Sequence, residues 1–347
     1  MKALIGVTLL AALGAVYYST MTSEYDLEEM YRSEFMSFVT SYDRSYADEG
    51  EMNMRYELFK NALDEINAHN AEGHTWTMGV TKFADWTEEE KQAVLGFNGS
   101  GKYRDSAKHI WRGAPISDSQ PIDWRDTEHA VTEVKDQGSC GSCWAFSAVA
   151  AMEHLNWWWN DEWDQLSEQQ LIDCSHNMGN DGCEGGEMLG AFEYYANDDV
   201  DRPNIAQPAA FDEEYQYHAK NEVCNHDIID FSATHMGGIS HHVLLDIDTT
   251  GELAKQAIQY RVMSVGVNAN RWFLYRKGII TNDVFDENRQ WLNHGVAMVG
   301  YGEEDGVEYF LLKNSWGKRW GEDGYLRVGI NDQSGVTQEL SFPEYRC

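Results

Sequence analysis

The chain has 347 residues, of which 42% are hydrophobic and 13% aromatic, which is enough for a packed core spread over roughly two or three units of ordinary domain size. The formal net charge is −32, and this argues against nucleic acid as a partner, because binding a phosphate backbone needs a basic face. No stretch has the composition of a disordered segment.

The N-terminus has the pattern of an export signal. Lys2 precedes an apolar run over residues 3–16, which has about the length of the hydrophobic region of a signal peptide and is too short for a comfortable membrane span. We therefore predict a signal peptide over residues 1–19 and a route to a lysosome, a digestive vacuole or the extracellular space. A buried N-terminal helix is the alternative. Export through an oxidising compartment favours disulfides among the six cysteines.

The next hundred residues are predicted to be mainly helical. Apolar side chains recur at helical spacing in two runs within residues 24–70, and a short extended stretch follows over residues 75–83. Residues 85–90 have a helix-start pattern. Periodicity is lost over residues 96–120, which we interpret as a linker.

The pattern changes after Pro121, where helices come first and strands later. Helices are predicted over residues 142–159, 166–174 and 189–197. Strands are predicted over residues 263–267, 295–301, 309–314 and 324–328, with a hairpin turn at 303–306. This order indicates an α+β protein whose two halves can pack face to face.

The segment Cys140-Gly-Ser-Cys143-Trp144 carries the strongest chemical signal, and three interpretations compete. A zinc site needs a second well-spaced pair, which Cys174 and Cys183 do not provide. A redox pair normally follows a strand of a βαβ unit, which is not evident here. In the third interpretation Cys143 begins a helix, where unpaired backbone N–H groups favour a thiolate and hence a nucleophile.

His294 is the candidate base for that nucleophile. It begins a predicted strand, and Asn314 closes the next one, so a hairpin of the two strands places Asn314 beside His294. The amide oxygen of Asn314 can then fix the imidazole tautomer while Trp316 shields the bond from water. Gln137, six residues before Cys143, can donate an amide N–H to an oxyanion hole. A purely structural histidine at a strand start is the simpler alternative.

Together these motifs resemble the papain family of cysteine proteases, whose signature C-G-[SA]-C-[WY] is matched in full. The matching segments are Pro121-Ile-Asp-Trp-Arg, residues 137–146, Cys174, Cys183-Glu-Gly-Gly186, His294-Gly and Asn314-Ser-Trp-Gly317. The resemblance implies a papain-like two-lobe fold, with Cys143 on a helical lobe and His294 and Asn314 on a β-barrel lobe. It also implies a cysteine endopeptidase without cofactor or metal, acting on proteins and peptides.

The segment before the peptidase domain is similar to an inhibitory propeptide of the cathepsin L type. Its interspersed helical motif stands as Glu51, Arg55, Phe59, Ile66 and Asn70, with Ala62 at one usual Asn position. The following short motif has Thr81 where Asn is common. The resemblance therefore implies a propeptide over residues 20–115 and a peptidase domain over 116–347. An ordinary helical hairpin is the alternative.

Further site residues are implied by the resemblance alone. It pairs Cys140 with Cys183 and Cys174 with Cys224, and it leaves Cys347 without a family partner. Substrate backbone would pair with Gly185 and Gly186. The pocket for the second residue before the scissile bond (P2) would be lined by Met188, Gly266 and Leu292, which predicts a bulky apolar residue there. No insertion long enough to occlude the cleft fits between Cys174 and Cys183, and this favours endopeptidase action.

Two other functions are alternatives. One is a catalytically inactive papain-fold binding protein, against which every expected catalytic position is filled. The other is a thiol acyltransferase of another fold, against which Gln137, Asn314 and the propeptide-like segment stand. We expect a monomer, inhibited by its own propeptide and open to cystatin-type inhibitors. We also expect activation in acid, where propeptide carboxylates such as Glu51 and Asp85 lose charge, with cleavage between residues 108 and 120.

Overall fold

The computed structural model describes residues 24–99, 109–113, 119–196, 208–231, 239–247, 250–281, 292–330 and 334–345. The chain forms two compact units, the first made of Met1–Glu65 with Ala84–Trp86 and the second of Ile66–Phe83 with Thr87–Cys347. The predicted signal peptide over residues 1–19 and Cys347 lie outside the described residues. Within the described ranges, no helix combines the length and the apolarity that a membrane span requires.

The first unit is built on helix α2 (Glu24–Ser41) and the first part of helix α3 (Glu49–Glu72). Its core is a cluster of buried aromatic rings, Tyr31, Phe35, Phe38, Tyr56 and Phe59. The carboxylate of Asp85 accepts hydrogen bonds from Arg44 and Tyr46, both at 3.0 Å. The two helices confirm the prediction for residues 24–70, with a break at residues 42–48.

The second unit contains a large sheet that includes ten strands of the described residues. These are β1 (Trp76–Met78), β2 (Ile110–Trp111), β3 (Ile122–Asp123), β4 (His241–Leu245), β5 (Met263–Val267), β6 (Tyr275–Ile280), β7 (His294–Glu304), β8 (Val307–Lys313), β9 (Tyr325–Gly329) and β10 (Glu339–Glu344). The strand order is β1-β6-β9-β8-β7-β5-β10-β4-β2, and β3 pairs with β7. The four predicted strands correspond to β5, β7, β8 and β9.

The hairpin of β7 and β8 is the part of the sheet that serves the candidate site. Glu304 pairs with Val307, which leaves Asp305 and Gly306 as a two-residue turn, both with positive φ (54° and 80°). A two-residue turn with positive φ at both positions matches the twist of the flanking strands, and Asp-Gly favours it. The predicted turn at 303–306 is thus confirmed.

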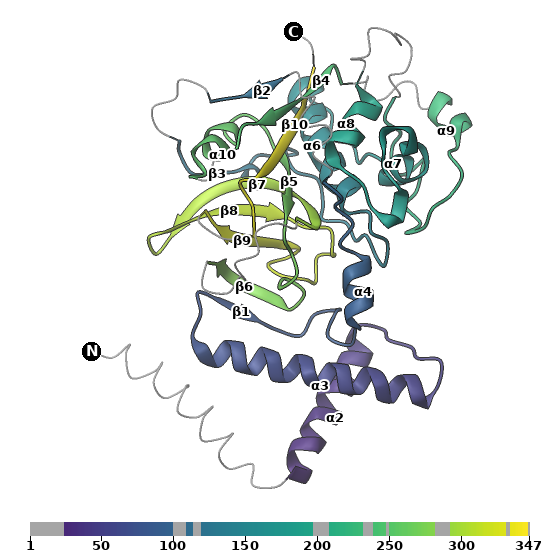
Figure 1. Cartoon of the computed structure of the whole chain (residues 1–347), viewed down its shortest axis with the longest axis vertical. Helices are drawn as coiled ribbons and strands as arrows, with labels where there is room; N and C mark the ends of the chain where they lie inside the picture. The colour runs from purple at the N-terminus through teal and green to yellow at the C-terminus, as the bar shows by residue number, and fades with distance from the viewer. Residues whose placement is uncertain are drawn as a thin grey trace. The chain divides into compact units, whose positions relative to one another are not determined.

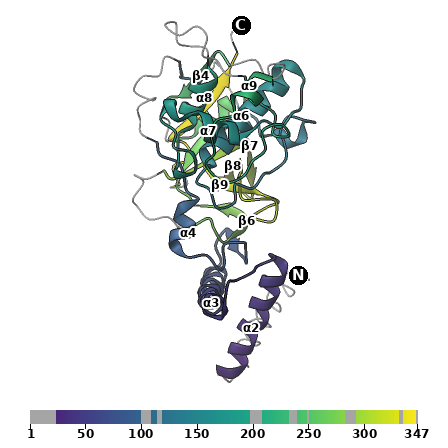
Figure 2. The same cartoon turned by 90° about the vertical axis from the view of Figure 1, so that its right-hand side faces the viewer.

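Helices α6 (Cys143–Asn160) and α8 (Met188–Tyr195) pack on the sheet, and further helices complete the α+β fold. The further helices are α4 (Glu88–Ala93), α7 (Glu168–Cys174), α9 (His226–Phe231) and α10 (Glu252–Ala257). Figures 1 and 2 show α6, α7 and α8 together at one side of strands β7 and β8. Two of these helices begin with caps: Thr87 forms a capping box with Glu90 before α4, and Ser167 accepts from the backbone N–H of Gln170 in α7.

Helix α6 is the central element of the core. Its buried side chains pack with those of α8 in one apolar cluster that includes Trp144, Met152, Leu155, Leu189 and Phe192. Polar bonds fix it against the sheet as well. The hydroxyl of Ser147 donates to the carbonyl of Val296 in β7 at 2.7 Å, and Ser264 of β5 donates to the carbonyl of Ser147 at 2.9 Å. The start of α6 is therefore held in register with the start of β7.

One short strand falls where the sequence indicated a linker. Ile110 and Trp111 form β2, which pairs in parallel with Leu244 and Leu245 of β4. Residues 100–108 and 114–118 of the predicted linker lie outside the described residues, and a two-residue strand is too short to give a period in the sequence.

Candidate active site

Cys143 is the first residue of α6 and is fully buried. Ser142 before it forms no side-chain cap hydrogen bond with the helix. The backbone N–H groups at the helix start therefore lie next to the cysteine. Burial raises the pKa of the Cys143 thiol to about 11, although backbone N–H groups of Gly295, Gly96 and Trp144 act on the sulfur in the opposite direction. In this state of the chain the thiol is neutral at neutral pH.

His294 stands at the start of β7 and is also fully buried. The next residue, Gly295, lies against the nucleophile candidate: a Cβ on Gly295 would be 3.1 Å from the carbonyl oxygen of Cys143. The close packing of β7 on α6 therefore brings His294 and Cys143, 151 positions apart in the sequence, into one neighbourhood.

Asn314 follows β8 and orients the imidazole. Its Oδ1 lies 2.8 Å from Nε2 of His294, and the ring of Trp316 lies 4.7 Å from the imidazole ring. Burial lowers the pKa of His294 to about 4, and the bond to Asn314 only partly offsets it. In the neutral ring Nε2–H donates to Asn314, which leaves Nδ1 as a buried acceptor with no hydrogen-bond partner among the described residues.

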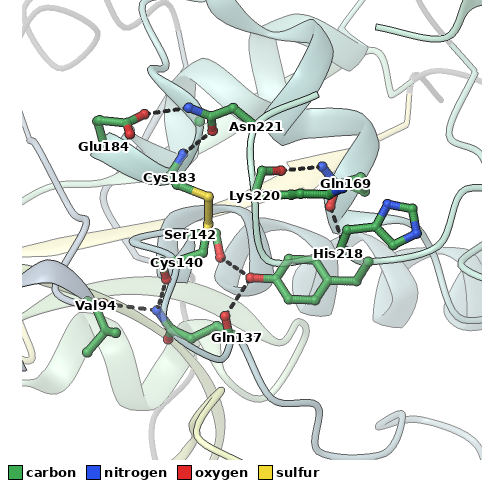
Figure 3. The surroundings of a disulfide bond; sticks show 12 residues. Val94, Gln137, Cys140, Ser142, Gln169, Cys183, Glu184, His218, Lys220 and Asn221 are labelled. Carbon is green, nitrogen blue, oxygen red and sulfur yellow. Dashed lines mark hydrogen bonds between the residues drawn. A yellow bond between two sulfur atoms is a disulfide. The ribbon is translucent and has the colours of Figure 1, made fainter. Parts of the chain in front are cut away.

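The side chain of Gln137 is fully buried and held on both sides of its amide. Its Oε1 accepts from the hydroxyl of Ser315 at 2.7 Å, and its Nε2 donates to the carbonyls of Cys140 (2.8 Å) and Val94 (2.9 Å). Figure 3 shows the amide nitrogen between these two carbonyls. The amide nitrogen is thus aimed at a backbone carbonyl of a segment that lies over the site.

That covering segment, residues 94–98, runs across the predicted site. The carbonyl of Gly96 accepts from the N–H of Gly186, and the N–H of Asn98 donates to the carbonyl of Gly186, both at 2.9 Å. Phe97 and Gly186 form a parallel bridge. A Cβ on Gly96 would lie only 1.7 Å from the carbonyl oxygen of Gly141, so only glycine fits at this close approach. Gly186 therefore pairs with the chain's own backbone.

One of the predicted pocket positions lies at the ring of Phe97. A Cβ on Gly266 would lie 2.9 Å from the Phe97 ring and 3.2 Å from Cβ of Glu339. Phe97 and Met188 are buried in the same large apolar cluster, and Leu292 packs against that cluster. The structure thus places an aromatic side chain at the Gly266 position.

Glu339 is a pocket neighbour that sequence reasoning missed. It lies directly opposite Gly266 in the pairing of β10 with β5. Its position follows from the register between β10 and β5. A single glutamate about two dozen residues after Asn314 carries no local sequence pattern that would predict this register. The Cβ of Glu339 lies 3.2 Å from the position that a Cβ on Gly266 would take.

The structure contains two disulfides, Cys140–Cys183 and Cys174–Cys224, the pairs that the family resemblance implied. Figure 3 shows the first one next to Gln137. The backbone N–H of Gly141 also donates to the carbonyl of Cys183 at 2.9 Å. Since Cys183 lies two residues before Gly185, this bridge ties the Gly185-Gly186 backbone to the loop that leads into Cys143.

A buried ionic cluster, defined here as Lys135, Glu153, Glu168, Lys313 and the hydroxyl of Thr132, lies behind Asn314. Lys135 Nζ is 3.1 Å from Glu153 and 2.8 Å from Glu168, and Lys313 Nζ donates to Thr132 at 2.8 Å. Thr132 in turn donates to Glu153. The four charged side chains line one small cavity together with Asn314 and Ser315. The cluster links α6 and α7 to the end of β8.

No group of three or more His, Cys, Asp or Glu side chains is arranged to hold a metal ion within the ranges that the structure describes.

Comparisons with known proteins agree with this geometry. Residues 119–344 match the papain family cysteine protease model, and residues 35–90 match the cathepsin propeptide inhibitor domain. The chain is 34% identical to digestive cysteine proteinase 3 of Homarus americanus over 319 residues, covering 88% of this chain and 92% of that protein. It is 35% identical to cathepsin L 2 of Paramecium tetraurelia, covering 95% and 98%.

Solved structures give the same result. Digestive procathepsin L 3 of Tenebrio molitor larval midgut superposes with a TM-score of 0.77 at 31% identity, covering 90% of this chain and 99% of that one. Procathepsin L2 from the same source gives a TM-score of 0.80 at 30% identity, again covering 90% and 99%. The chain therefore belongs to the papain family of cysteine proteases, as a cysteine-type endopeptidase that carries a cathepsin propeptide inhibitor domain.

Proposed function

We propose that the chain is the zymogen of an acid-activated endopeptidase in which Cys143 is the nucleophile, His294 the base and Asn314 the orienting residue. The observation that carries this assignment is the packing of Gly295 on Cys143, beside an imidazole whose Nε2 is fixed by Asn314 at 2.8 Å. That bond leaves Nδ1 of His294 to exchange a proton with the thiol.

The proposed reaction is acyl transfer to sulfur. Nδ1 of His294 takes the proton of Cys143, and the thiolate attacks the peptide carbonyl carbon. The oxyanion accepts hydrogen bonds from the backbone N–H of Cys143 and from Nε2 of Gln137. In the zymogen this Nε2 donates to the carbonyl of Val94 instead. The imidazolium then protonates the leaving amine, and water activated by the same imidazole hydrolyses the thioester.

We infer the substrate preference from what the covering segment places in the pocket. The ring of Phe97 contacts the Gly266 position, which supports a bulky apolar residue at P2. The backbone of Gly185 and Gly186 would pair with the substrate strand once the segment has left. Glu339 adds a carboxylate that can meet a basic P2 side chain, and this should broaden the preference.

The same segment supports inhibition by the chain's own propeptide. Phe97 forms a parallel β-bridge with Gly186, and the carbonyl of Val94 accepts the hydrogen bond that Nε2 of Gln137 donates. We propose a propeptide over residues 20–115 that is cut between residues 108 and 120, and a peptidase domain over 116–347. The same proposal includes a signal peptide over residues 1–19 and a lysosomal, vacuolar or extracellular destination. It also includes a monomeric state and inhibition by cystatin-type proteins.

Hydrolysis of fluorogenic peptide amides tests this function. Full-length protein should be silent at about pH 7, and at pH 4–5 it should shorten and cleave amides with Phe or Leu at P2. An epoxide that alkylates thiols should block the activity. Full-length Cys143→Ala should not shorten unless active enzyme is added. Lack of any amide hydrolysis after shortening would favour the inactive binding protein, and shortening of Cys143→Ala alone would assign processing to another protease.

A further inference from the structure

Residues 66–83 pair with the peptidase sheet through one short strand, and Thr81 and Phe83 add contacts to Phe273. β1 pairs antiparallel with β6, with Trp76 opposite Gly278 and Thr77 opposite Lys277. The hydroxyl of Thr75 donates to the carbonyl of Ile279 at 2.6 Å, and the N–H of Gly79 donates to the carbonyl of Leu274 at 2.8 Å. A three-residue strand at a sheet edge forms few such bonds, so its attachment depends on the side chains that pack beside it.

Two histidines provide that packing. The imidazoles of His69 and His74 stack with ring centres 4.4 Å apart, and the His69 ring lies 4.1 Å from the ring of Trp76. Trp76 in turn packs on Tyr275 of β6 at 5.9 Å. His69 is only 8% exposed, and its Nε2 lies 3.2 Å from the carbonyl of Trp76. The two stacked imidazole rings therefore cover Trp76, the first residue of β1.

Charged groups of both signs lie near the stack and the β1–β6 pairing. Glu72 pairs with His74 at 2.7 Å and acts on His69. Arg271 acts on His69 from the loop before β6, and Arg276 and Lys277 stand on β6 itself, with the Arg276 side chain packed beside Gly79. At the pairing, Oε1 of Glu322 accepts from the N–H of Gly278 at 2.9 Å, and Glu322 is paired with Arg327. A protonated His69 would therefore lie near Arg271 and near a carboxylate that is already engaged by His74.

We propose that the His69–His74 stack is an acid switch, in which protonation of His69 loosens β1 from β6 and so frees the propeptide from the peptidase sheet. The proposal rests on the acid-activated zymogen proposed above and names its trigger. A charge on His69 is buried against Trp76 and is disfavoured by Arg271, and it reaches water only when His69 leaves the cover of Trp76.

The sign of the linkage agrees with release in acid. Burial lowers the pKa of His69 below the 6.5 of an exposed imidazole, and His74 and Arg271 lower it further. The attached state thus binds fewer protons than the detached one. Attachment is favoured above about pH 6.5 and weakens as the pH falls below that value.

The carboxylate route expected from the sequence has the opposite sign at Asp85. Burial raises the pKa of Asp85 despite its Arg44 and Tyr46 partners. A carboxyl with a raised pKa takes up its proton more readily in the folded unit than in the unfolded chain, so acid does not weaken the fold through Asp85. The histidine stack supplies the acid sensitivity that Asp85 does not.

Hydrogen exchange in full-length Cys143→Ser tests the switch without any peptidase activity. The readout is the protection factor, corrected for intrinsic exchange, of the amides of Gly79 and Ile279, which bridge the β1 region and β6. Between roughly pH 7 and pH 5 we expect protection to fall about tenfold or more. In His69→Phe/His74→Phe, whose rings can stack but not charge, the fall should shrink to about twofold or less.

Two controls make the outcome decisive. His218→Phe removes a histidine paired with Glu222 in the peptidase domain. In this variant the protection factors should fall with pH as much as in the parent Cys143→Ser protein. His74→Phe alone, at the more exposed ring, should reduce the pH-dependent loss of protection at least about twofold. This single variant keeps the test valid if replacing buried His69 harms folding. A double variant that folds and keeps the full fall overturns the proposal, as does a parent without any fall. Wild-type hydrolysis, measured separately, decides the proposed function.

Discussion

The proposed catalytic centre and the ionic cluster both lie between α6 and the β7–β8 hairpin, yet burial has a different outcome for Lys135 than for the thiol and the imidazole. In the cluster, burial alone lowers the pKa of Lys135, but Glu153 and Glu168 outweigh it and hold that pKa above its ordinary value. In the centre, burial drives Cys143 and His294 toward their neutral forms, and Nδ1 of His294 has no hydrogen-bond partner among the described residues. Within the cluster, burial still pushes Glu168 and Lys313 toward their neutral forms, so the contrast holds for Lys135, which two carboxylates keep charged. Pairing of that kind makes a structural ion, and the unpaired Nδ1 of His294 is left able to exchange a proton.

The sharpest test of this contrast exchanges sulfur for oxygen at Cys143. Cys143→Ser should lower kcat/KM on the order of 10⁴-fold or more, because a hydroxyl does not form the anion that the helix start favours. Its thermal unfolding should match that of the wild type. Cys140→Ser is the paired control: it breaks a disulfide and should instead cost about 2–5 kcal/mol of stability. Substantial activity in Cys143→Ser would contradict the assignment of the nucleophile.

Breaking the cluster should affect folding rather than chemistry. Glu153→Ala leaves Lys135 and the N–H of Leu166 without their shared carboxylate, and this should cost about 3–5 kcal/mol in the free energy of unfolding. Glu128→Ala, at a side chain that is 89% exposed, is the control and should change stability by less than about 0.5 kcal/mol. Equal effects of the two substitutions in urea unfolding would mean that the cluster is not structural.

Gln137 tests whether the amide beside the centre acts in the transition state. Gln137→Ala removes a donor that now binds the carbonyl of Val94, and kcat should fall about 10²–10³-fold. Activity is normalised by titrating Cys143 with an epoxide, so that misfolded enzyme is not counted. Gln169→Ala removes another buried glutamine, bonded to Asp173 and Lys220, and should lower stability but not kcat per active site. A loss of kcat in both variants would indicate a general packing effect.

The smallest expected effect concerns specificity. Glu339→Gln keeps the shape of the side chain and removes its charge, so kcat/KM for a substrate with Arg at P2 should fall about tenfold relative to Phe at P2. Glu344→Gln, on the same strand but paired with Arg261, should leave that ratio unchanged. An unchanged Arg-to-Phe ratio in Glu339→Gln would show that the carboxylate does not reach the pocket.

Local chemistry was predictable from the sequence, whereas long-range register was not. The start of α6 at Cys143, the Asp305-Gly306 turn and the pairing of His294 with Asn314 follow from short motifs and a hairpin of adjacent strands. The extended stretch at 75–83 was predicted, but not its partner β6, about two hundred residues further on. Glu339, the ionic cluster and β2 escaped prediction for the same reason, since each is placed by contacts between distant segments.

Cys143 lies three residues from Cys140, so a reactive thiol and a permanent disulfide share one turn of chain. A thiolate that attacks carbonyl carbon also attacks disulfide sulfur, and exchange would move the bridge from Cys140 onto the nucleophile. In the folded zymogen Cys143 is fully buried and its pKa is raised, so little thiolate is present to start that exchange. Burial of Cys143 beside Gly96 of the covering segment therefore keeps this thiol from exchanging with the adjacent disulfide in the folded zymogen.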